Sequence, residues 1–288
     1  MPSMQKLGGI LPSWMKDSKN IYFFKDRFCP LCGRPLQAFK DPETGEPRSD
    51  GACPYCGWQP DSTSQAEINR THQAQHQLDI KQAAGFLTYT SFVNDHDIFG
   101  HAFANFIAND RFTKQAKAKA EQLASQIGAG QVVHSNFHGP TGTGKTHLAV
   151  AVANQAIHDS NYRLRATVIN SPKLMQERQR MINAAPDERR EFNRKMAKIK
   201  QQTRLLILDD LGAESSLKTT DFDRQTISEM INDFEDKSLI ITTNQVGHEL
   251  HIMYGQRTIS RILKHSYSNG KNQHIDFAKL SDHRALKV

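Results

Sequence analysis

One short stretch limits what this chain can fold into more than any other. The segment HGPTGTGKTHL, residues 138–148, holds four residues between a glycine and the run Gly144-Lys145-Thr146. This spacing is typical of a loop that surrounds phosphates with backbone amides at the start of a helix. The lysine then reaches the β- and γ-phosphates, and the threonine hydroxyl binds Mg²⁺. We therefore predict a nucleoside triphosphate site, whose residues are Gly139, Pro140, Thr141, Gly142, Thr143, Gly144, Lys145 and Thr146.

Apolar runs alternate with helix-like runs around this loop. The expected strands cover residues 132–139, 164–171, 205–210, 238–244 and 274–277. A helix is expected directly after the loop, at residues 146–160, and another over residues 172–203 with a break at Pro186. Strands that alternate with helices form parallel sheets with right-handed crossovers. The predicted fold class is therefore α/β, with a five-stranded parallel sheet.

Two aspartates end the most apolar of these strands, LLILDD, residues 205–210. A carboxylate at the end of a buried strand is the usual second half of a phosphate-loop site. Asp209 is predicted to hold Mg²⁺ through water, and Asp210 to orient and deprotonate the attacking water. Many ATPases carry glutamate at the second position, which reaches one methylene further. Glu214 is therefore a reserve candidate for the base.

The strand over residues 238–244 ends in the polar run Thr242-Thr243-Asn244. In sheets of this kind it lies beside the strand that leads into the phosphate loop. Asn244 can then hydrogen-bond both the attacking water and the γ-phosphate.

All four cysteines are grouped in two copies of the pattern Cys-Pro-x-Cys-Gly: Cys29 with Cys32, and Cys53 with Cys56. Four thiolates at this spacing fit tetrahedral Zn²⁺, and so short a segment needs the metal for much of its folding energy. No strand–helix–strand context surrounds either pair, so a redox or iron–sulfur role is the weaker alternative. His72 and His76 could add a metal site if they lie on a helix. We interpret them as exposed linker residues, because four thiolates already complete a coordination shell.

Charge and composition divide the chain. Residues 1–80 hold nine basic and nine acidic side chains, so their net charge is zero. Residues 171–204 hold ten basic and four acidic side chains, and residues 257–288 hold seven basic and two acidic ones. This uneven excess of cations is the footprint of a nucleic-acid contact, although basic helices are often only solvated faces. The predicted domains are a zinc module (1–60), a linker or exposed helix (61–84) and an ATPase domain (85–288).

The sequence also argues against membrane and secreted classes. No apolar run approaches the roughly 18 residues of a membrane span, and the first residues show no secretory signal. Cysteines grouped in one metal clip suit a reducing compartment. We expect a cytoplasmic protein without a membrane partner.

The phosphate loop, the Asp-Asp strand and the Asn-ended strand, in this order, resemble AAA+ ATPases. LLILDDLGAE in particular resembles the helicase-loader branch: the bacterial DnaC and DnaI proteins, their phage homologues, and the related IstB transposition helpers. The resemblance covers about residues 86–288. It implies that Arg261, with Arg257 as fallback, is an arginine finger that reaches into a neighbouring subunit's site. It further implies that Arg284 touches phosphate in its own subunit.

DnaI-type loaders also carry an N-terminal zinc module that contacts the replicative helicase. The resemblance thus implies an ATPase that uses ATP, Mg²⁺ and Zn²⁺, self-associates, and loads a hexameric helicase onto single-stranded DNA. Residues 171–204 would contact the DNA, with Phe192 as their only aromatic side chain for stacking. Two alternatives stay open: an IstB-type transposition helper on duplex DNA, and a zinc-ribbon adaptor that uses ATP only as a conformational latch.

Overall fold

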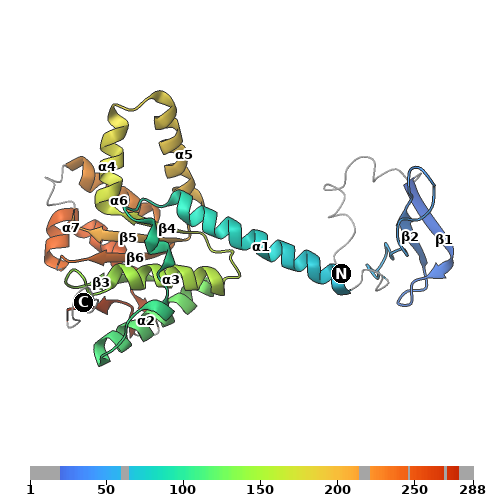
Figure 1. Cartoon of the computed structure of the whole chain (residues 1–288), viewed down its shortest axis with the longest axis horizontal. Helices are drawn as coiled ribbons and strands as arrows, with labels where there is room; N and C mark the ends of the chain where they lie inside the picture. Colours follow the sequence, from blue (N-terminus) through green and yellow to red (C-terminus); the bar gives the residue numbers. More distant parts are fainter. Residues whose placement is uncertain (1–19, 60–64, 214–220, 246, 269–270, 279–288) are drawn as a thin grey trace. The chain divides into compact units, whose positions relative to one another are not determined.

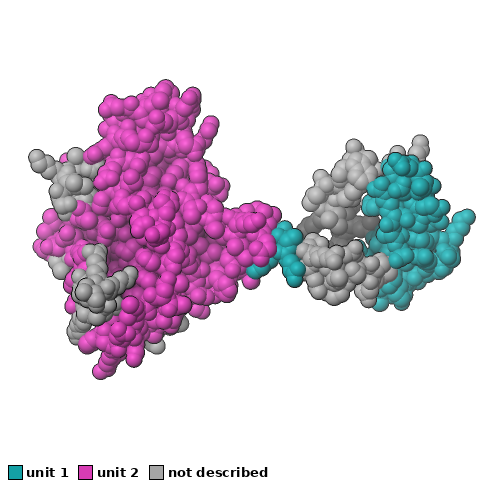
Figure 2. Space-filling view, viewed as in Figure 1, with its two compact units in different colours: residues 1–76 teal, residues 77–288 magenta. Residues whose placement is uncertain are grey.

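The structure, a computed structural model, describes residues 20–59, 65–213, 221–245, 247–268 and 271–278. Glu214 and Arg284 therefore lie outside the described residues. The chain divides into two compact units, residues 1–76 and 77–288, which are coloured separately in Figure 2.

The first unit is built on a two-stranded antiparallel sheet. Strand β1 (Ile21–Phe28) pairs with β2 (Pro35–Phe39). An isolated bridge joins Gln37 of β2 to Ala52, the residue before Cys53. Among its described residues, the hydrophobic core is small and consists of Phe24, Cys29, Leu36, Ala38 and Cys53. A core this small gives little hydrophobic stabilisation, which is what we expect of a module that takes much of its folding energy from a metal.

Helix α1 (Gln65–Thr90) begins within the first unit and ends within the second. Its later turns pack into the second unit, where Ala83 and Leu87 are buried. Its last residue, Thr90, hydrogen-bonds the hydroxyl of Thr167 at 2.8 Å. His76 is exposed on this helix, in keeping with the interpretation as a linker residue.

The second unit contains the predicted five-stranded parallel sheet (Figure 1). Its strands, in spatial order, are β4 (Ala166–Asn170), β5 (Leu205–Leu211), β6 (Ser238–Thr243), β3 (His134–His138) and β9 (Ile275–Asp276). Strand β6 pairs directly with β3, with Thr243 opposite His138, as expected for the strand that ends in Asn244. The carboxyl ends of β3, β5 and β6 therefore meet at one edge.

Both faces of the sheet are covered by helices, which explains the unbroken apolar run of β5. Leu205 and Ile207 belong to one hydrophobic cluster, and Leu206 and Leu208 to a second one on the other face. The first cluster is formed with α1, α2 (Arg111–Gly128) and α3 (Lys145–Asp159). The second is formed with α4 (Ser171–Ile182), α5 (Pro186–Gln202), α6 (Asp221–Asp233) and α7 (Gly247–Leu263).

Helices α4 and α5 replace the single interrupted helix expected over residues 172–203. The break occurs where it was predicted, because Pro186 is the first residue of α5. Figure 1 shows the two helices projecting together from the sheet. Two short 3-10 helices, His96–Gly100 and Phe103–Asn105, precede α2, and a small hairpin of β7 (Tyr267–Ser268) and β8 (Lys271–Asn272) follows α7. Among the helices that the structure describes, none is long and apolar enough to cross a membrane.

Candidate nucleotide site and metal cluster

The phosphate loop joins the end of β3 to the start of α3, as its sequence predicts. Gly144 caps α3 with a left-handed backbone (φ 88°), which favours glycine. A Cβ on Gly139 would lie 2.7 Å from the backbone carbonyl carbon of Phe277, so no side chain fits there. The Lys145 ammonium is buried and donates to the carbonyl oxygens of Gly139 and Pro140, each at 2.7 Å. The loop thus folds around its lysine.

The acidic pair at the end of β5 has two different environments. Asp209 is buried, and its Oδ1 accepts hydrogen bonds from the hydroxyls of Thr146 at 2.7 Å and Thr242 at 2.6 Å. Asp210 is partly exposed and has a left-handed backbone (φ 55°), which is uncommon outside glycine. Asn170 donates to a carboxylate oxygen of each, at 3.4 Å for Asp209 and 3.2 Å for Asp210. The adjacent oxygens of Thr146 and Asp209 are hard ligands of the kind that Mg²⁺ prefers.

Asn244 lies within hydrogen-bonding distance of the loop. Its Oδ1 accepts from the Lys145 ammonium at 2.7 Å, and its Nδ2 donates to the Thr141 hydroxyl at 2.9 Å. Strands β3, β5 and β6 therefore bring together five residues that were predicted separately: Lys145, Thr146, Asp209, Asp210 and Asn244.

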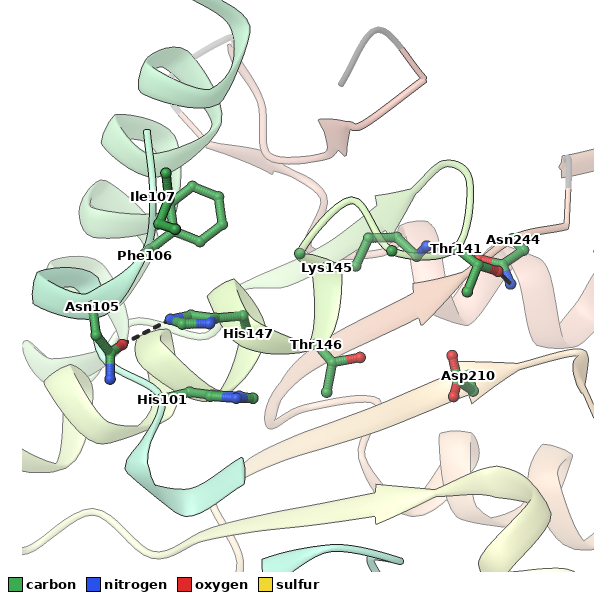
Figure 3. A pocket seen from close by; sticks show the side chains of 12 residues that line it. His101, Asn105, Phe106, Ile107, Thr141, Lys145, Thr146, His147, Asp210 and Asn244 are labelled. Carbon is green, nitrogen blue, oxygen red and sulfur yellow. Dashed lines mark hydrogen bonds between the residues drawn. The ribbon is translucent and has the colours of Figure 1, made fainter. Parts of the chain in front are cut away.

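Four of these residues, Lys145, Thr146, Asp210 and Asn244, border a cavity of about 420 Å³, a size common for ligand pockets, whereas the buried Asp209 does not line it. Figure 3 shows Lys145, Thr141 and Asn244 at one end, with Thr146 and Asp210 below them. The other end is lined by residues that no sequence motif marked: His101, Asn105, Phe106, Ile107 and His147.

The newly identified residues are organised around His147, which directly follows Thr146. Its ring stacks on His101, with centroids 4.2 Å apart and planes 10° apart, and Phe106 packs edge-on against it. Its Nε2 lies 3.1 Å from the Ala102 carbonyl and 2.9 Å from Asn105 Oδ1. Because the carbonyl can only accept, Nε2 carries the proton. Position next to Thr146 was the only sequence signal for His147, and nothing in residues 96–107 marked the others.

Arg261 does not line this cavity. It lies in the last turn of α7, and its backbone carbonyl contacts the imidazole Nδ1 of His134 at 3.0 Å. His134 is the first residue of β3, whereas the phosphate loop follows the last. Arg261 therefore lies at the amino ends of the parallel strands, and the phosphate loop lies at their carboxyl ends. Its Nε donates to Glu235 at 3.1 Å. Arg257, on the same helix, is exposed.

The four cysteine sulfurs lie within 4.8 Å of one another. The pairs Cys29–Cys56 and Cys32–Cys53 are each 3.4 Å apart, close to the roughly 3.8 Å between ligands of tetrahedral zinc with Zn–S bonds of about 2.3 Å. The cluster thus fits the predicted zinc ribbon.

The basic segment 171–204 is less available than its net charge indicates. Several of its cations form ion pairs: Lys173 and Arg180 with Glu177, Arg180 with Glu188, Arg190 with Asp187, Arg194 with Glu191, and Lys200 with Asp233. Arg178 and Arg189 form none with the side chains that the structure describes, and both line a groove of about 690 Å³. The net charge of the segment therefore overstates the number of cations that are free to bind phosphate.

Phe192, the aromatic side chain expected to stack on DNA bases, is not the exposed aromatic residue of this region. Phe192 is partly buried and packs against Phe92, with ring centroids 5.8 Å apart. The exposed aromatic in the groove is Phe222, outside the segment, at 57% exposure and with the Arg178 guanidinium 4.7 Å from its ring centroid. An aromatic surface for stacking is therefore present, but α6 supplies it.

Comparison with known proteins agrees with this geometry. Among solved structures, that of DnaI shares 22% identity and covers 67% of this chain and 96% of its own, with a TM-score of 0.50. The structure of a candidate primosome component from Streptococcus pyogenes serotype M3 shares 17% sequence identity and has a TM-score of 0.50. The match covers 67% of this chain and 94% of that chain. The structure of the DnaC helicase loader shares 21% sequence identity and has a TM-score of 0.49. The match covers 63% of this chain and 99% of that chain. At such identities the likeness to the first two concerns the fold alone.

No curated protein matches the sequence significantly. The family model described as IstB-like ATP binding protein matches residues 107–266, more than half of the chain, including the phosphate loop, the acidic pair, Asn244 and Arg261. The protein therefore belongs to the IstB-like ATP binding family, with an AAA+ core preceded by a four-cysteine cluster.

Proposed function

We propose that this protein is an ATPase that places a hexameric replicative helicase onto single-stranded DNA. The observation that carries the proposal is the presence, in one chain, of an IstB-like ATP-binding core and an N-terminal four-cysteine module. The core alone suits either a helicase loader or a transposition helper. A separate metal-supported module adds a second attachment point, which a loader needs in order to hold the helicase while the core holds DNA.

For hydrolysis, the residues around the cavity divide the work. The Lys145 ammonium, now shared among two loop carbonyls and Asn244, would bind the β- and γ-phosphates. Thr146 and Asp209 would hold Mg²⁺, which neutralises phosphate charge when bound. Asp210 would accept the proton of the attacking water, and Asn244 would orient that water against the γ-phosphate. At the far end of the cavity, the His101–His147 pair offers a flat surface for the nucleotide base.

The charge that develops on the transferring phosphoryl group needs a further cation. Arg261 lies at the opposite edge of the sheet from its own phosphate loop, so it would act in a neighbouring subunit. We therefore propose side-by-side self-association, with Arg257 as the second candidate finger. Arg284 remains the proposed phosphate contact in the same subunit.

The two domains would then have separate tasks in the cytoplasm. Residues 1–60, held together by zinc on Cys29, Cys32, Cys53 and Cys56, would bind the helicase, since equal numbers of acidic and basic side chains over residues 1–80 do not suit DNA. Residues 85–288 would bind ATP and DNA. Within them, Arg178 and Arg189 would contact phosphates, and Phe222 would stack on a base.

One pair of assays tests the proposal and its competitors. Phosphate release by the full chain is measured alone, with circular single-stranded DNA and with duplex DNA, and binding to the purified replicative helicase of the cell in which it acts is measured by gel filtration. We expect stimulation by single strands and a stable helicase complex. Stimulation by duplex alone, without helicase binding, would support a transposition helper. ATP binding without any phosphate release would support a conformational latch.

A further inference from the structure

The guanidinium group of Arg261 is held along one edge. Its Nε donates to Glu235 Oε2 at 3.1 Å, and its side chain is only 19% exposed. Its two terminal nitrogens, Nη1 and Nη2, make no hydrogen bond with the residues that the structure describes. Because the guanidinium is planar and its N–H groups form a rigid fork, a bond at Nε fixes the direction in which the other N–H groups point.

Glu235 is itself firmly placed. It lies in the turn between α6 and β6, directly after the fully buried Phe234. Its second oxygen, Oε1, accepts from the Lys264 ammonium at 2.9 Å. The hydrogen bonds from Lys264 and then from Arg261 lower the pKa of this carboxyl group, so it remains charged at neutral pH. One carboxylate therefore joins two cations at the end of α7.

The backbone of Arg261 is fixed as well. The buried imidazole of His134 lies 3.0 Å from the Arg261 carbonyl and 2.9 Å from the Lys237 carbonyl. The first residue of β3 thus connects the end of α7 to the turn that carries Glu235. Side chain and main chain of Arg261 are held by two elements that meet at the same edge of the sheet.

From this geometry we propose that Glu235 is a positioning residue for Arg261, which fixes the guanidinium with Nη1 and Nη2 directed toward the phosphate of a neighbouring subunit. The inference rests on the proposed function, in which Arg261 acts in trans. A free arginine loses rotamer entropy when it docks, whereas a guanidinium that is already oriented loses less. Glu235 would thereby raise the rate of hydrolysis without touching the nucleotide.

The neighbouring carboxylate gives a matched control. Asp236 also accepts from Lys264 at 2.9 Å, but it is 82% exposed and makes no contact with Arg261. Glu235→Ala should lower kcat for ATP by about 10-fold to 100-fold, the range expected for a misplaced catalytic group, with KM for ATP unchanged. Glu235→Gln should keep part of the rate, because its amide oxygen still accepts from Nε. Asp236→Ala should stay close to wild type.

A double variant separates positioning from a structural role. In the Arg261→Ala background, Glu235→Ala should cause no further loss of rate, because two residues that act through one group are not additive. A structural role would instead lower the thermal midpoint and ATP affinity in both backgrounds, and that result would overturn the proposal. If Glu235→Ala does not fold, the same comparison is made with Glu235→Gln.

Mixed assemblies then locate Glu235 on the finger side of the interface. Glu235→Ala mixed with Asp210→Asn should regain turnover, because one interface pairs an intact base with an intact finger. Glu235→Ala mixed with Arg261→Ala should not, because every interface then receives an altered finger. A Glu235→Ala protein as fast as, or faster than, wild type, beside a slow Arg261→Ala, would overturn this inference alone. A wild-type rate for Arg261→Ala would instead contradict the proposed function.

Discussion

The hydroxyl of Thr146 donates to Asp209 Oδ1 at 2.7 Å, which joins the start of α3 to the end of β5. The same oxygen accepts from Thr242 at 2.6 Å, so β6 is included in the contact. Three elements that are distant in sequence thus place the oxygen atoms of Thr146 and Asp209 side by side. The pair is the basis for the proposed Mg²⁺ position.

Asp209→Asn tests this position directly. The amide retains the size of the carboxylate and can still accept a hydrogen bond, but it lacks the charge that draws a divalent ion. We expect the rate of ATP hydrolysis to fall by about 10²-fold, with a higher Mg²⁺ concentration needed for half-maximal rate. Titration of phosphate release against Mg²⁺ measures both effects. An unchanged Mg²⁺ dependence would rule Asp209 out as a ligand.

Cys29→Ser tests the metal cluster. The variant keeps three thiolates, so zinc content should fall and the first unit, with its small core, should unfold. ATP binding should be spared, because residues 57–288 contain no cysteine. Metal analysis and nucleotide binding on the same sample measure both. Absence of zinc from the wild-type protein would refute the assignment.

His274 predicts how stability depends on pH. Burial, and then the charge of Lys119, lower the pKa of His274 below its usual value near 6.5, and its Nδ1 accepts from the Asn136 amide at 2.9 Å. The unfolded chain therefore binds more protons as the pH falls below about 6.5, so the free energy of unfolding should decrease there. His274→Gln can still accept that hydrogen bond but does not titrate. Urea unfolding between about pH 7.5 and pH 5 should show a weaker pH dependence in the variant than in wild type; equal slopes would exclude His274 as the cause.

The groove on α4, α5 and α6 predicts which cations bind DNA. Charge reversal at Arg178 and Arg189, which form no described ion pair, should weaken single-stranded DNA binding. Each lost phosphate contact should flatten the log–log salt dependence by about 0.7. Arg190→Glu, whose cation pairs with Asp187, is the matched control and should have the smaller effect. Phe222→Ala should weaken binding by about 1–3 kcal/mol at every salt concentration. Equal effects of Arg189→Glu and Arg190→Glu would mean that the groove is not the contact.

The sequence was sufficient to predict structure where a chemical motif and a regular apolar pattern occur in the same segment. The apolar run of β5 and the glycines around Lys145 have few alternative structures, so the strands, the loop and the spatial proximity of Lys145, Thr146, Asp209, Asp210 and Asn244 were predictable. His101 and Asn105 were not, because they enter the cavity only through the packing of residues 96–107 against α3. Net charge over residues 171–204 also could not show which cations pair with neighbouring carboxylates. Which cation pairs with which carboxylate depends on the helix face that each side chain occupies. It also depends on Asp233 of α6, which lies outside that segment.

Phosphate release by a mixture of two inactive variants tests the central claim most directly. Arg261→Ala and Asp210→Asn should each bind ATP and hydrolyse it slowly. The first lacks the cation supplied in trans, which is worth about 10³ to 10⁵ in rate, and the second lacks the base. In a mixture of equal parts, roughly a quarter of the interfaces pair an intact base with an intact finger, so turnover should return to about that fraction of the wild-type rate. A mixture that associates on gel filtration yet stays as slow as either variant would contradict catalysis across a subunit interface.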